Sequence, residues 1–531
     1  MKTSLRTLGL RGLCAAATLV TVSAPRPARA TGFTDIGEDI KAQTETTIKV
    51  TGQMRVRGAA FYNLDLDRGP TPSGQLLFPV PLSDPKGQWM SGADLRLRTD
   101  VSFYAPFASV AVRARLDVPD NLILGGAPDG IPGGTTTQLP TAALRIKRVY
   151  GEALTPLGLI AAGRMGSHWG LGILTNGGDC VDCNSGDAAD RIAFITPLGG
   201  FIWAASFDFS STGPSRTAKD GASAVNLNPS TGVRTATVAF LRWRDERALA
   251  RRRKAGKTTF ELGGYVSHRW QKNDAPATYV PLASPAPLSP STVMYRGFTA
   301  TAFDAWTRLT GPWGRIEMEG AVLLANVDQA SLVPGALYNK PVKSLQIGAA
   351  LESEFGAPED PVTGGLDAGY ASGDPAPGFG VKARIGGALP KPGDLDGAQI
   401  NMPSDNRIDN FRFHPDYRID RILFREIIGT VTDAVYIRPH VRWNIMRLGT
   451  SWLTASLAGV ISFATFASST PGNAAPLGVE LDPTLSYGSK DGFGAAIEHG
   501  VLFPLAGLNN PDLKLNAKPA QMVRLRLTYA F

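Results

Sequence analysis

The chain has 531 residues, and its 54 Lys and Arg against 46 Asp and Glu give a formal net charge of +8. The first thirty residues carry five cations and no acid, so without them the charge is only +3, which argues against a nucleic-acid-binding protein. After this segment no stretch approaches 18 uninterrupted apolar residues, which argues against a membrane-spanning helix.

The N-terminal segment has the composition of an export signal. Three cations precede an apolar run, and the small-residue motif Ala28-Arg29-Ala30 follows it. A basic start, an apolar centre and such a cleavage motif predict a signal peptide over residues 1–30. Residues 31–45 are then expected to form a short periplasmic lead-in, and 46–531 to form the folded part.

Eighteen stretches of the folded part show the apolar–polar alternation of a half-buried strand and are bounded by turn residues. An even number of strands is what a single-chain bacterial outer-membrane barrel requires. In chain order, the predicted strands are 46–62, 89–104, 107–119, 143–154, 158–165, 189–196, 200–210, 231–244, 257–271, 293–309, 312–326, 343–356, 362–372, 432–448, 451–466, 475–489, 491–505 and 519–531.

The links between these strands alternate in length. Short links hold turn residues, as in Thr155-Pro156-Leu157-Gly158 and Thr310-Gly311-Pro312. Short periplasmic turns that alternate with long extracellular loops are typical of a transmembrane antiparallel β-barrel, so the sequence predicts an all-β fold of this kind with about eighteen strands. Two links fit less well, the basic 245–256 and the short 467–474. The long links are about 63–88, 120–142, 166–188, 211–230, 272–292, 327–342 and 373–431.

The last predicted strand ends on aromatic residues. Its apolar face includes Leu527, Tyr529 and Phe531, and its polar face includes Arg524 and Arg526. In an outer-membrane barrel such an apolar face meets lipid. We therefore expect the outer membrane of a Gram-negative bacterium as the location. The expected partners are membrane lipid and, through the strand that ends in Phe531, the barrel-assembly machinery.

Sorting charged residues by strand face predicts two walls in the lumen. Facing walls of opposite charge create a transverse field across a water-filled channel, and the arginine side favours anions. The alternative is that these charges only pair with their neighbours across strands. The basic wall consists of Arg55, Arg57, Arg96, Arg98, Arg113, Arg115, Arg145, Arg524 and Arg526. The acidic wall consists of Glu261, Glu317, Glu319, Glu352, Glu354 and Asp367.

Cys180 and Cys183 are the only cysteines after the N-terminal segment, and both lie in the long link 166–188. At an oxidising cell surface two such cysteines are expected to form a disulfide, with a redox or metal site as the alternatives. We expect no cofactor and no metal here, because the surrounding aspartates fit turn chemistry in a glycine-rich loop. Ca²⁺ is the alternative, but the order of the aspartates does not match the usual calcium-binding loop. These aspartates are Asp179, Asp182, Asp187 and Asp190.

The longest link, 373–431, contains aromatic residues and an apolar run from Ile419 to Ile428. A loop of this length and composition needs a surface to pack against. We expect it to lie inside the barrel mouth as a constriction or lid. The alternative is an extracellular cap over the rim.

Four parts of the chain carry a resemblance to a known family. They are Gly163-Arg164-Met165 with His168-Trp169-Gly170-Leu171-Gly172, Asp179-Cys180 with Asp182-Cys183, Ala371-Ser372-Gly373-Asp374-Pro375, and Leu423-Phe424-Arg425-Glu426-Ile427-Ile428-Gly429-Thr430-Val431-Thr432. Over most of its length the chain resembles a family of uncharacterised outer-membrane proteins known mainly from myxobacteria. The resemblance implies a barrel but brings no substrate and no catalytic residue. More loosely, the architecture is similar to eighteen-strand substrate porins and alginate-export channels.

Three functions remain in view. The first is a passive, porin-like channel for small hydrophilic or anionic solutes, gated by loop 373–431. The second is a plugged barrel that displays its loops for surface binding or adhesion. The third, an outer-membrane hydrolase, needs an activated nucleophile, and none of the five histidines lies in a nucleophile motif. We therefore expect a channel and not an enzyme, with no nucleic acid among its partners.

Overall fold

The computed structural model describes residues 33, 36, 46–82, 88–105, 109–125, 144–217, 224–275, 293–331, 340–357, 359–380, 391–395 and 405–531. Every structural statement below concerns these residues. The predicted signal peptide lies outside them, as does most of the predicted lead-in.

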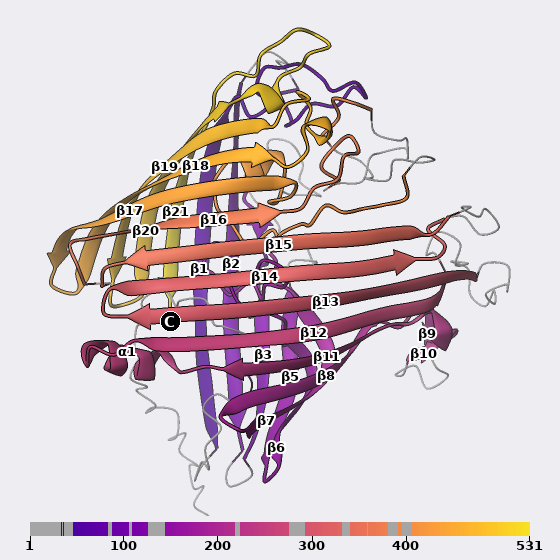
Figure 1. The fold of residues 1–531 in the computed structure, drawn as a ribbon. Helices are drawn as coiled ribbons and strands as arrows, with labels where there is room; N and C mark the ends of the chain where they lie inside the picture. Colours follow the sequence, from indigo (N-terminus) through magenta and orange to yellow (C-terminus); the bar gives the residue numbers. More distant parts are fainter. Residues whose placement is uncertain are drawn as a thin grey trace, which may run out of the picture.

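Eighteen strands form a closed antiparallel ring (Figure 1). The last strand, β21, pairs with β1, where Tyr529 lies opposite Met54 and Leu527 lies opposite Val56. Because the ring has no free edge, its backbone hydrogen-bonding groups are satisfied within the sheet. The ring strands are β1 (Thr47–Tyr62), β2 (Trp89–Tyr104), β3 (Val110–Asp117), β5 (Arg145–Thr155), β6 (Gly158–Gly166), β7 (Ala188–Leu198), β8 (Phe201–Ser211), β11 (Val233–Arg242), β12 (Thr259–Asp274), β13 (Met294–Gly311), β14 (Gly314–Val327), β15 (Val342–Phe355), β16 (Val362–Ala371), β17 (Ala434–Leu448), β18 (Ser451–Ala464), β19 (Pro476–Ser489), β20 (Phe493–Pro504) and β21 (Ala520–Ala530).

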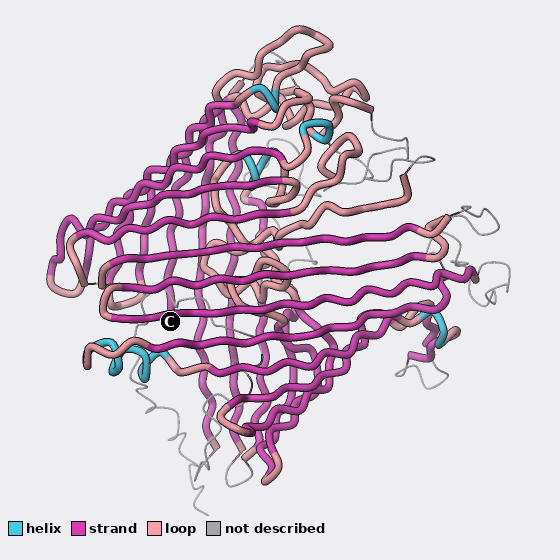
Figure 2. The backbone as a smooth tube through the Cα atoms, viewed as in Figure 1, coloured by secondary structure: helices cyan, strands magenta, loops and turns pink. Residues whose placement is uncertain are grey.

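The remaining elements are short (Figure 2). A single α-helix, α1 (Glu246–Lys254), links β11 to β12 within the described part of the chain. None of the described helices combines the length and the hydropathy that a membrane crossing needs. The other elements are β4 (Leu122–Ile123), which pairs with β2, the hairpin of β9 (Ser215–Thr217) and β10 (Ala224–Asn226), the 3₁₀ turns η3 (Pro229–Thr231), η7 (Ala467–Ser469) and η8 (Ala506–Leu508), and the π-helical turn η6 (Leu423–Ile427).

Side chains along the strands alternate between an apolar outer face and a buried polar inner face. In β1, Ile48 and Val50 are 61% and 51% exposed, whereas Arg55 and Arg57 are buried. In water a continuous apolar surface of this kind would drive aggregation, whereas hydrocarbon is its stable environment. The outer face is therefore a membrane-facing surface, and the polar face surrounds the lumen.

The two ends of the ring differ in their connections. Turns of a few residues close one end, such as 156–157, 312–313 and 449–450, and the long loops lie at the other end. Figure 2 shows these loops gathered at one end of the strands. The predicted alternation of short and long links is confirmed.

Each predicted strand corresponds to a strand of the ring. The largest differences are of three residues, at the start of β3, predicted at 107 and observed at Val110, and at the end of β12, predicted at 271 and observed at Asp274. Residues 107 and 108 lie outside the described residues. The hairpin of β9 and β10 was wrongly assigned to a loop, since strands of three residues show too little alternation to be recognised.

Candidate functional site in the barrel lumen

The loop between β6 and β7 folds back into the lumen and contacts the inner face of β1 and β2. The Arg55 guanidinium donates hydrogen bonds to the carbonyl oxygens of Val181 and Cys183, at 3.1 and 2.9 Å. Arg96 donates to the same two carbonyls, and Arg98 donates to the Gly178 carbonyl at 2.7 Å. Three arginines of the wall therefore hold this loop in place. The sequence predicted that all three face the pore.

A carboxylate on the opposite wall holds the beginning of the same loop. Glu319 of β14 is buried and accepts a hydrogen bond from the Gly172 N–H at 2.9 Å. The chain passes so close to this carboxylate that a Cβ at Gly170 would lie 2.6 Å from the Glu319 side chain, and Gly170 has a φ of 53°. Glycine is the residue that tolerates both conditions. The loop thus spans the lumen between the two predicted walls.

The long loop between β16 and β17 also enters the lumen. Glu480 of β19 accepts hydrogen bonds from the backbone N–H groups of Arg421, Ile422 and Leu423, at 2.8, 2.8 and 3.0 Å. These donors begin the π-helical turn η6, and a carboxylate is well placed to satisfy free N–H groups at the start of a helical turn. The apolar residues of the turn pack in a buried cluster with the wall residues Tyr436 and Leu502. The part of the loop around η6 therefore packs inside the ring, against the wall.

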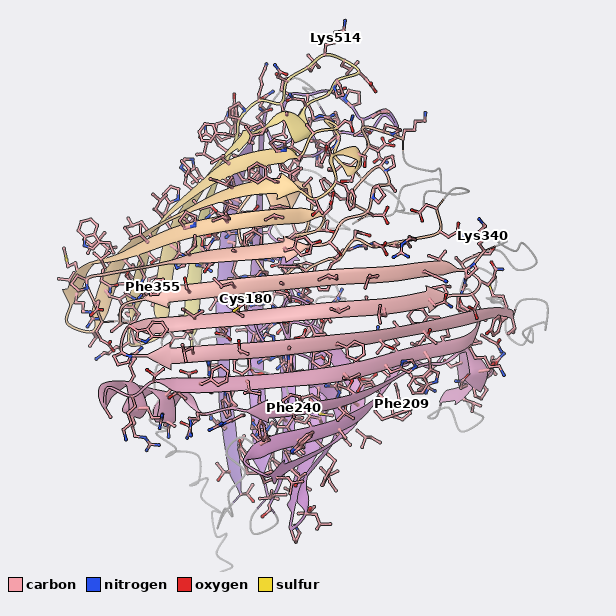
Figure 3. The ribbon with its side chains drawn as sticks, in the orientation of Figure 1. Cys180, Phe209, Phe240, Lys340, Phe355 and Lys514 are labelled. Atoms are coloured by element: carbon pink, nitrogen blue, oxygen red, sulfur yellow. A yellow bond between two sulfur atoms is a disulfide. The ribbon has the colours of Figure 1, made fainter. Side chains whose placement is uncertain are left out.

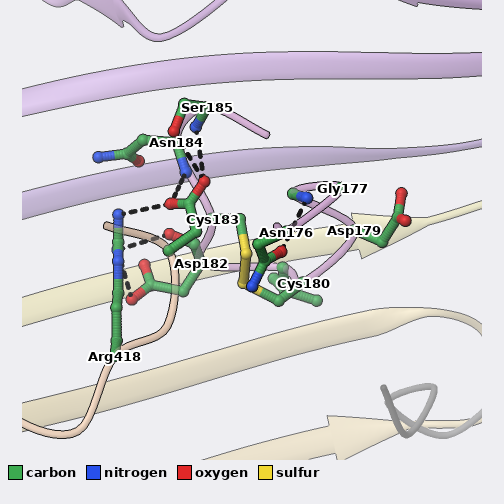
Figure 4. Close-up of a disulfide and its surroundings, with 12 residues drawn as sticks. Asn176, Gly177, Asp179, Cys180, Asp182, Cys183, Asn184, Ser185 and Arg418 are labelled. Atoms are coloured by element: carbon green, nitrogen blue, oxygen red, sulfur yellow. Dashed lines mark hydrogen bonds and ion pairs between the residues drawn. A yellow bond between two sulfur atoms is a disulfide. The ribbon is translucent and has the colours of Figure 1, made fainter. Parts of the chain in front are cut away.

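The two inward loops meet at one carboxylate. We define the Asp182 cluster as Asp182 with Arg57 of β1, Arg524 of β21, and Arg418 and Arg425 of the long loop. The shortest distances from the Asp182 carboxylate to these four guanidinium groups are 2.9, 3.1, 3.2 and 2.6 Å, respectively. Figure 4 shows Arg418 reaching Asp182 beside the disulfide. One side chain thus joins both loops to the basic wall.

A second carboxylate strengthens the contact between the loops. Asp416 of the long loop accepts hydrogen bonds from the backbone N–H groups of Asn184 and Ser185, at 2.8 and 3.0 Å. Figure 3 labels Cys180 between the two ends of the strands, and the bonds from Arg55 and Arg96 place its turn against β1 and β2. The contact between the loops therefore lies inside the ring.

The electrostatics of the Asp182 cluster set its response to pH. Burial alone would raise the pKa of Asp182, but the guanidinium groups of Arg425, Arg524 and Arg418 hold that pKa well below its ordinary value. A carboxylate with a lowered pKa stabilises the folded state above its ordinary pKa of about 4 and loses this contribution as the pH falls through the lowered value. The loops are therefore expected to stay docked from neutral pH down to about 4.

Single-channel recordings at about pH 7, 5 and 3 check this expectation. The frequency of brief closing and opening events in the current should be similar at pH 7 and pH 5 and should rise only at pH 3. A frequency that already rises between pH 7 and 5 would show that a carboxylate other than Asp182 controls the docking of the loops.

The structure joins Cys180 and Cys183 by a disulfide within the turn that carries Asp182 (Figure 4). This turn presents the carbonyl groups of Val181 and Cys183 to Arg55 and Arg96. The disulfide therefore restricts the turn through which the loop docks on Arg55 and Arg96.

Replacing both cysteines by serine is expected to lower the free energy of unfolding by about 2 kcal/mol, the chain-entropy value for a loop this short. Urea titration of the detergent-solubilised chain measures this difference. Wild-type protein kept under a reducing agent should lose a similar amount. An unchanged transition in both samples would contradict the structural role of the bond.

The four aspartates considered as an alternative calcium site each contact a basic side chain. Asp179 pairs with Arg115 and Arg148, Asp190 pairs with Arg164 at 2.7 Å, and Asp187 lies 3.5 Å from His414. In the described ranges no group of three or more His, Cys, Asp or Glu side chains is placed to hold a metal ion. The carboxylates point to cations on different elements and do not converge on one point.

The predicted basic wall is largely neutralised by adjacent carboxylates and carbonyls. Besides the arginines already described, Arg113 pairs with Glu152 at 2.6 Å, Arg115 with Asp100 at 2.6 Å, and Arg526 with Glu498 at 3.1 Å. Arg145 differs from the others: its side chain is 65% exposed and lies 3.6 Å from Asp120. Arg145 lies opposite Asp117 at the start of β5, and the register shift between Arg115 and Leu116 brings Arg148 opposite Arg115, where it contacts the inward loop.

The predicted acidic wall is paired in the same way. Arg308 lies 2.7 Å from Glu261, and Arg315 bridges Glu317 and Glu352 at 2.5 and 3.2 Å. These two cations were not predicted as partners of the acidic wall. Comparing their strand positions with those of the carboxylates could have identified them. The other two pairs are Glu354 with His440 at 3.1 Å and Asp367 with Arg438 at 2.5 Å.

Small openings remain beside the docked loop. One small cavity, with about 30 Å³ of space for water molecules, lies between the loop and the basic wall. Its wall-side lining consists of four cations, Arg98, Arg115, Lys147 and Arg148, and its loop side includes Ser185 and Asp187. Cations of the basic wall therefore border this cavity.

An apolar cluster fills the lumen near the short turns of β5 to β8. It includes Tyr150, Leu159, Trp169 and Trp306. Ile36 of the predicted lead-in is buried in this cluster, so this residue lies among wall side chains.

Neither family models nor curated proteins match the chain. Solved outer-membrane proteins do match. OpdK of Pseudomonas aeruginosa, solved with vanillate, has 12% identity and a TM-score of 0.41 over 91% of this chain and 98% of that chain. OccK11 (OpdR) of the same organism has 9% identity and a TM-score of 0.44 over 92% of this chain and 98% of that chain. The outer membrane channel DcaP of Acinetobacter baumannii has 13% identity and a TM-score of 0.38 over 92% of this chain and 99% of that chain. At these values nothing about the site carries over, and the resemblance to the myxobacterial family stays a prediction.

Proposed function

We propose that the chain is an outer-membrane channel for small hydrophilic solutes, with a preference for anions. The observation that carries this proposal is a closed ring with an apolar outer face, in which a small cavity lined by four cations lies between the loop and the basic wall. Rings of this strand number enclose an aqueous channel unless other parts of the chain fill it.

The charge distribution supports the preference for anions. Although most arginines have a partner, basic residues outnumber acidic residues on β1, β3, β5 and β21, and the two kinds are equal in number on β2. On β14, β15 and β16 the carboxylates are in the majority. A solute anion that passes along the inner face of β2 and β3 meets Arg98 and Arg115, and these cations lower its electrostatic barrier.

The two inward loops are the proposed constriction. Loop 167–187 crosses the lumen from Glu319 to Arg55, and the long loop is fixed on Glu480. Both are held by charged hydrogen bonds, which are stronger than neutral ones and favour a fixed geometry. The loops would then set the size limit for solutes, and the basic wall would set the charge preference.

Liposome swelling tests the proposal. Vesicles that contain the purified chain should swell faster in an isotonic small organic anion than in a neutral sugar or an organic cation of similar size. Equal rates for all three would remove the anion preference. A lack of swelling with every solute would favour a second candidate, a plugged barrel that displays its loops for binding, for which the apolar clusters around Trp169 and Ile422 are the supporting observation.

A further inference from the structure

The basic link between β11 and β12 forms helix α1 at the short-turn end of the barrel (Figure 1). Asp245 is its N-cap and accepts a hydrogen bond from the Ala248 N–H at 2.7 Å. The sequence Glu246-Arg247-Ala248-Leu249-Ala250-Arg251-Arg252-Arg253-Lys254 places most cations in the last turn, where they interact favourably with the helix dipole. The local sequence thus forms a stable helix at the rim.

One face of α1 is fixed to the barrel. Leu249 is buried, and Glu246 lies 3.7 Å from Arg308 on the inner face of β13. The Arg252 guanidinium donates hydrogen bonds to the Thr259 hydroxyl at 2.6 Å and to the Thr258 carbonyl at 3.0 Å. These contacts hold the orientation of the helix relative to the wall.

The opposite face carries exposed cations. Arg247, Arg251 and Lys254 are all exposed. Their spacing of four and three residues places them in one stripe along the helix. Lys257 in the following turn and Arg242 at the end of β11 are exposed as well. No carboxylate among the described residues forms an ion pair with Arg247, Arg251 or Lys254 within 4 Å.

The membrane boundary lies next to this stripe. Phe260, Trp313 and Phe355 are exposed apolar residues at the ends of neighbouring strands, and the rings of Trp313 and Phe355 are 6.3 Å apart. Aromatic side chains of this kind form the girdle at the interface of a transmembrane barrel. A helix that starts four residues after the end of β11 lies just beyond that girdle, at the depth of the lipid headgroups.

We propose that the Arg247, Arg251 and Lys254 face of α1 is a docking surface for anionic glycerophospholipids of the periplasmic leaflet. Phosphate oxygens accept charged hydrogen bonds from guanidinium and ammonium groups, and each cation near an anionic membrane surface adds about 1 kcal/mol to the attraction. Short turns face the periplasm in bacterial barrels, which assigns the leaflet. The proposal rests on the position of the barrel in the membrane and does not depend on solute transport.

Native mass spectrometry of the full chain in detergent, titrated with phosphatidylglycerol or phosphatidylcholine, tests this inference. Wild-type protein should retain phosphatidylglycerol in preference to phosphatidylcholine. The R251Q/K254Q variant should bind phosphatidylglycerol about thirtyfold more weakly, because two cations are lost. The matched control is R447Q/K490Q, which removes one Arg and one Lys, also exposed, from other turns at the same end, and it should bind as wild type does.

Several outcomes would overturn the proposal. They are equal affinity of wild type for the two lipids, an unchanged affinity in R251Q/K254Q, and an equal loss in the control. Displacement of the lipid by the same concentration of glycerol phosphate would point to free phosphate as the ligand, and displacement by a soluble peptidoglycan fragment would point to the cell wall. If R251Q/K254Q does not fold, the charge-conserving swap R251K/K254R and the salt dependence of wild-type binding decide the question, because a charge-based site keeps its lipid in the swap and releases it at high salt.

Discussion

Removing the long inward loop should increase the single-channel conductance several-fold. Ala371 and Ala434 lie opposite each other in the register of β16 and β17, so a two-residue Asn-Gly turn can replace residues 372–433 without displacing either strand. The ring keeps all its strand pairs, while the segment anchored on Glu480 leaves the lumen. A ring of this strand number without the loop encloses a wide aqueous channel. Recording in planar bilayers measures the change.

The matched control removes another long loop at the same end. Asp274 and Met294 are also opposite each other, so Asn-Gly can replace residues 275–293, which the sequence predicts to be an exposed segment. The control should conduct as wild type does. A loop-excised barrel with wild-type conductance would place the narrowest point of the pore elsewhere.

The Asp182→Asn substitution should destabilise the protein and loosen both loops. It leaves four guanidinium groups without their shared carboxylate, and loss of one partner from a largely buried ion cluster costs about 3 kcal/mol. Urea titration in detergent gives the change in the free energy of unfolding. Because one negative charge is lost beside the basic wall, the reversal potential in a salt gradient should also shift toward anions.

Asp190→Asn is the matched control for this substitution. Asp190 pairs with Arg164, but both side chains are about half exposed, and such pairs contribute 1 kcal/mol or less as a rough figure. The control should change neither stability nor selectivity to a comparable extent. If the two variants behave alike, Asp182 is one more surface carboxylate and the two loops are held by other contacts.

The strands of the ring could be predicted because each one carries its own signal. In β1 the alternation of Ile48, Val50 and Met54 with polar residues fixes both the strand and the face that meets the membrane. Turn residues between strands mark the ends, so even β19 and β20 are recovered within two residues. Such information is local, and a single sequence contains it.

The contents of the lumen depend on contacts that are distant in sequence. Asp182 and Arg524 are separated by 342 residues, and nothing in the alternation of β21 indicates that Arg524 holds a loop. The same alternation predicted that Arg55 faces the lumen but not that backbone carbonyls of a loop surround its guanidinium. Burial of an arginine requires partners, and here the partners come from the loops. The alternation assigned the charges of the two walls to strand faces, whereas their pairing was only one of two alternatives.

The central claim is that a closed ring in the membrane surrounds a water-filled path that two docked loops narrow. Recording the unmodified full chain in a planar bilayer tests it most directly. We expect discrete steps of small conductance, with a reversal potential in a salt gradient that favours anions. A folded, inserted barrel that shows no conductance steps would contradict a water-filled path. Steps of large conductance without a charge preference would contradict the narrowing of the path by the loops.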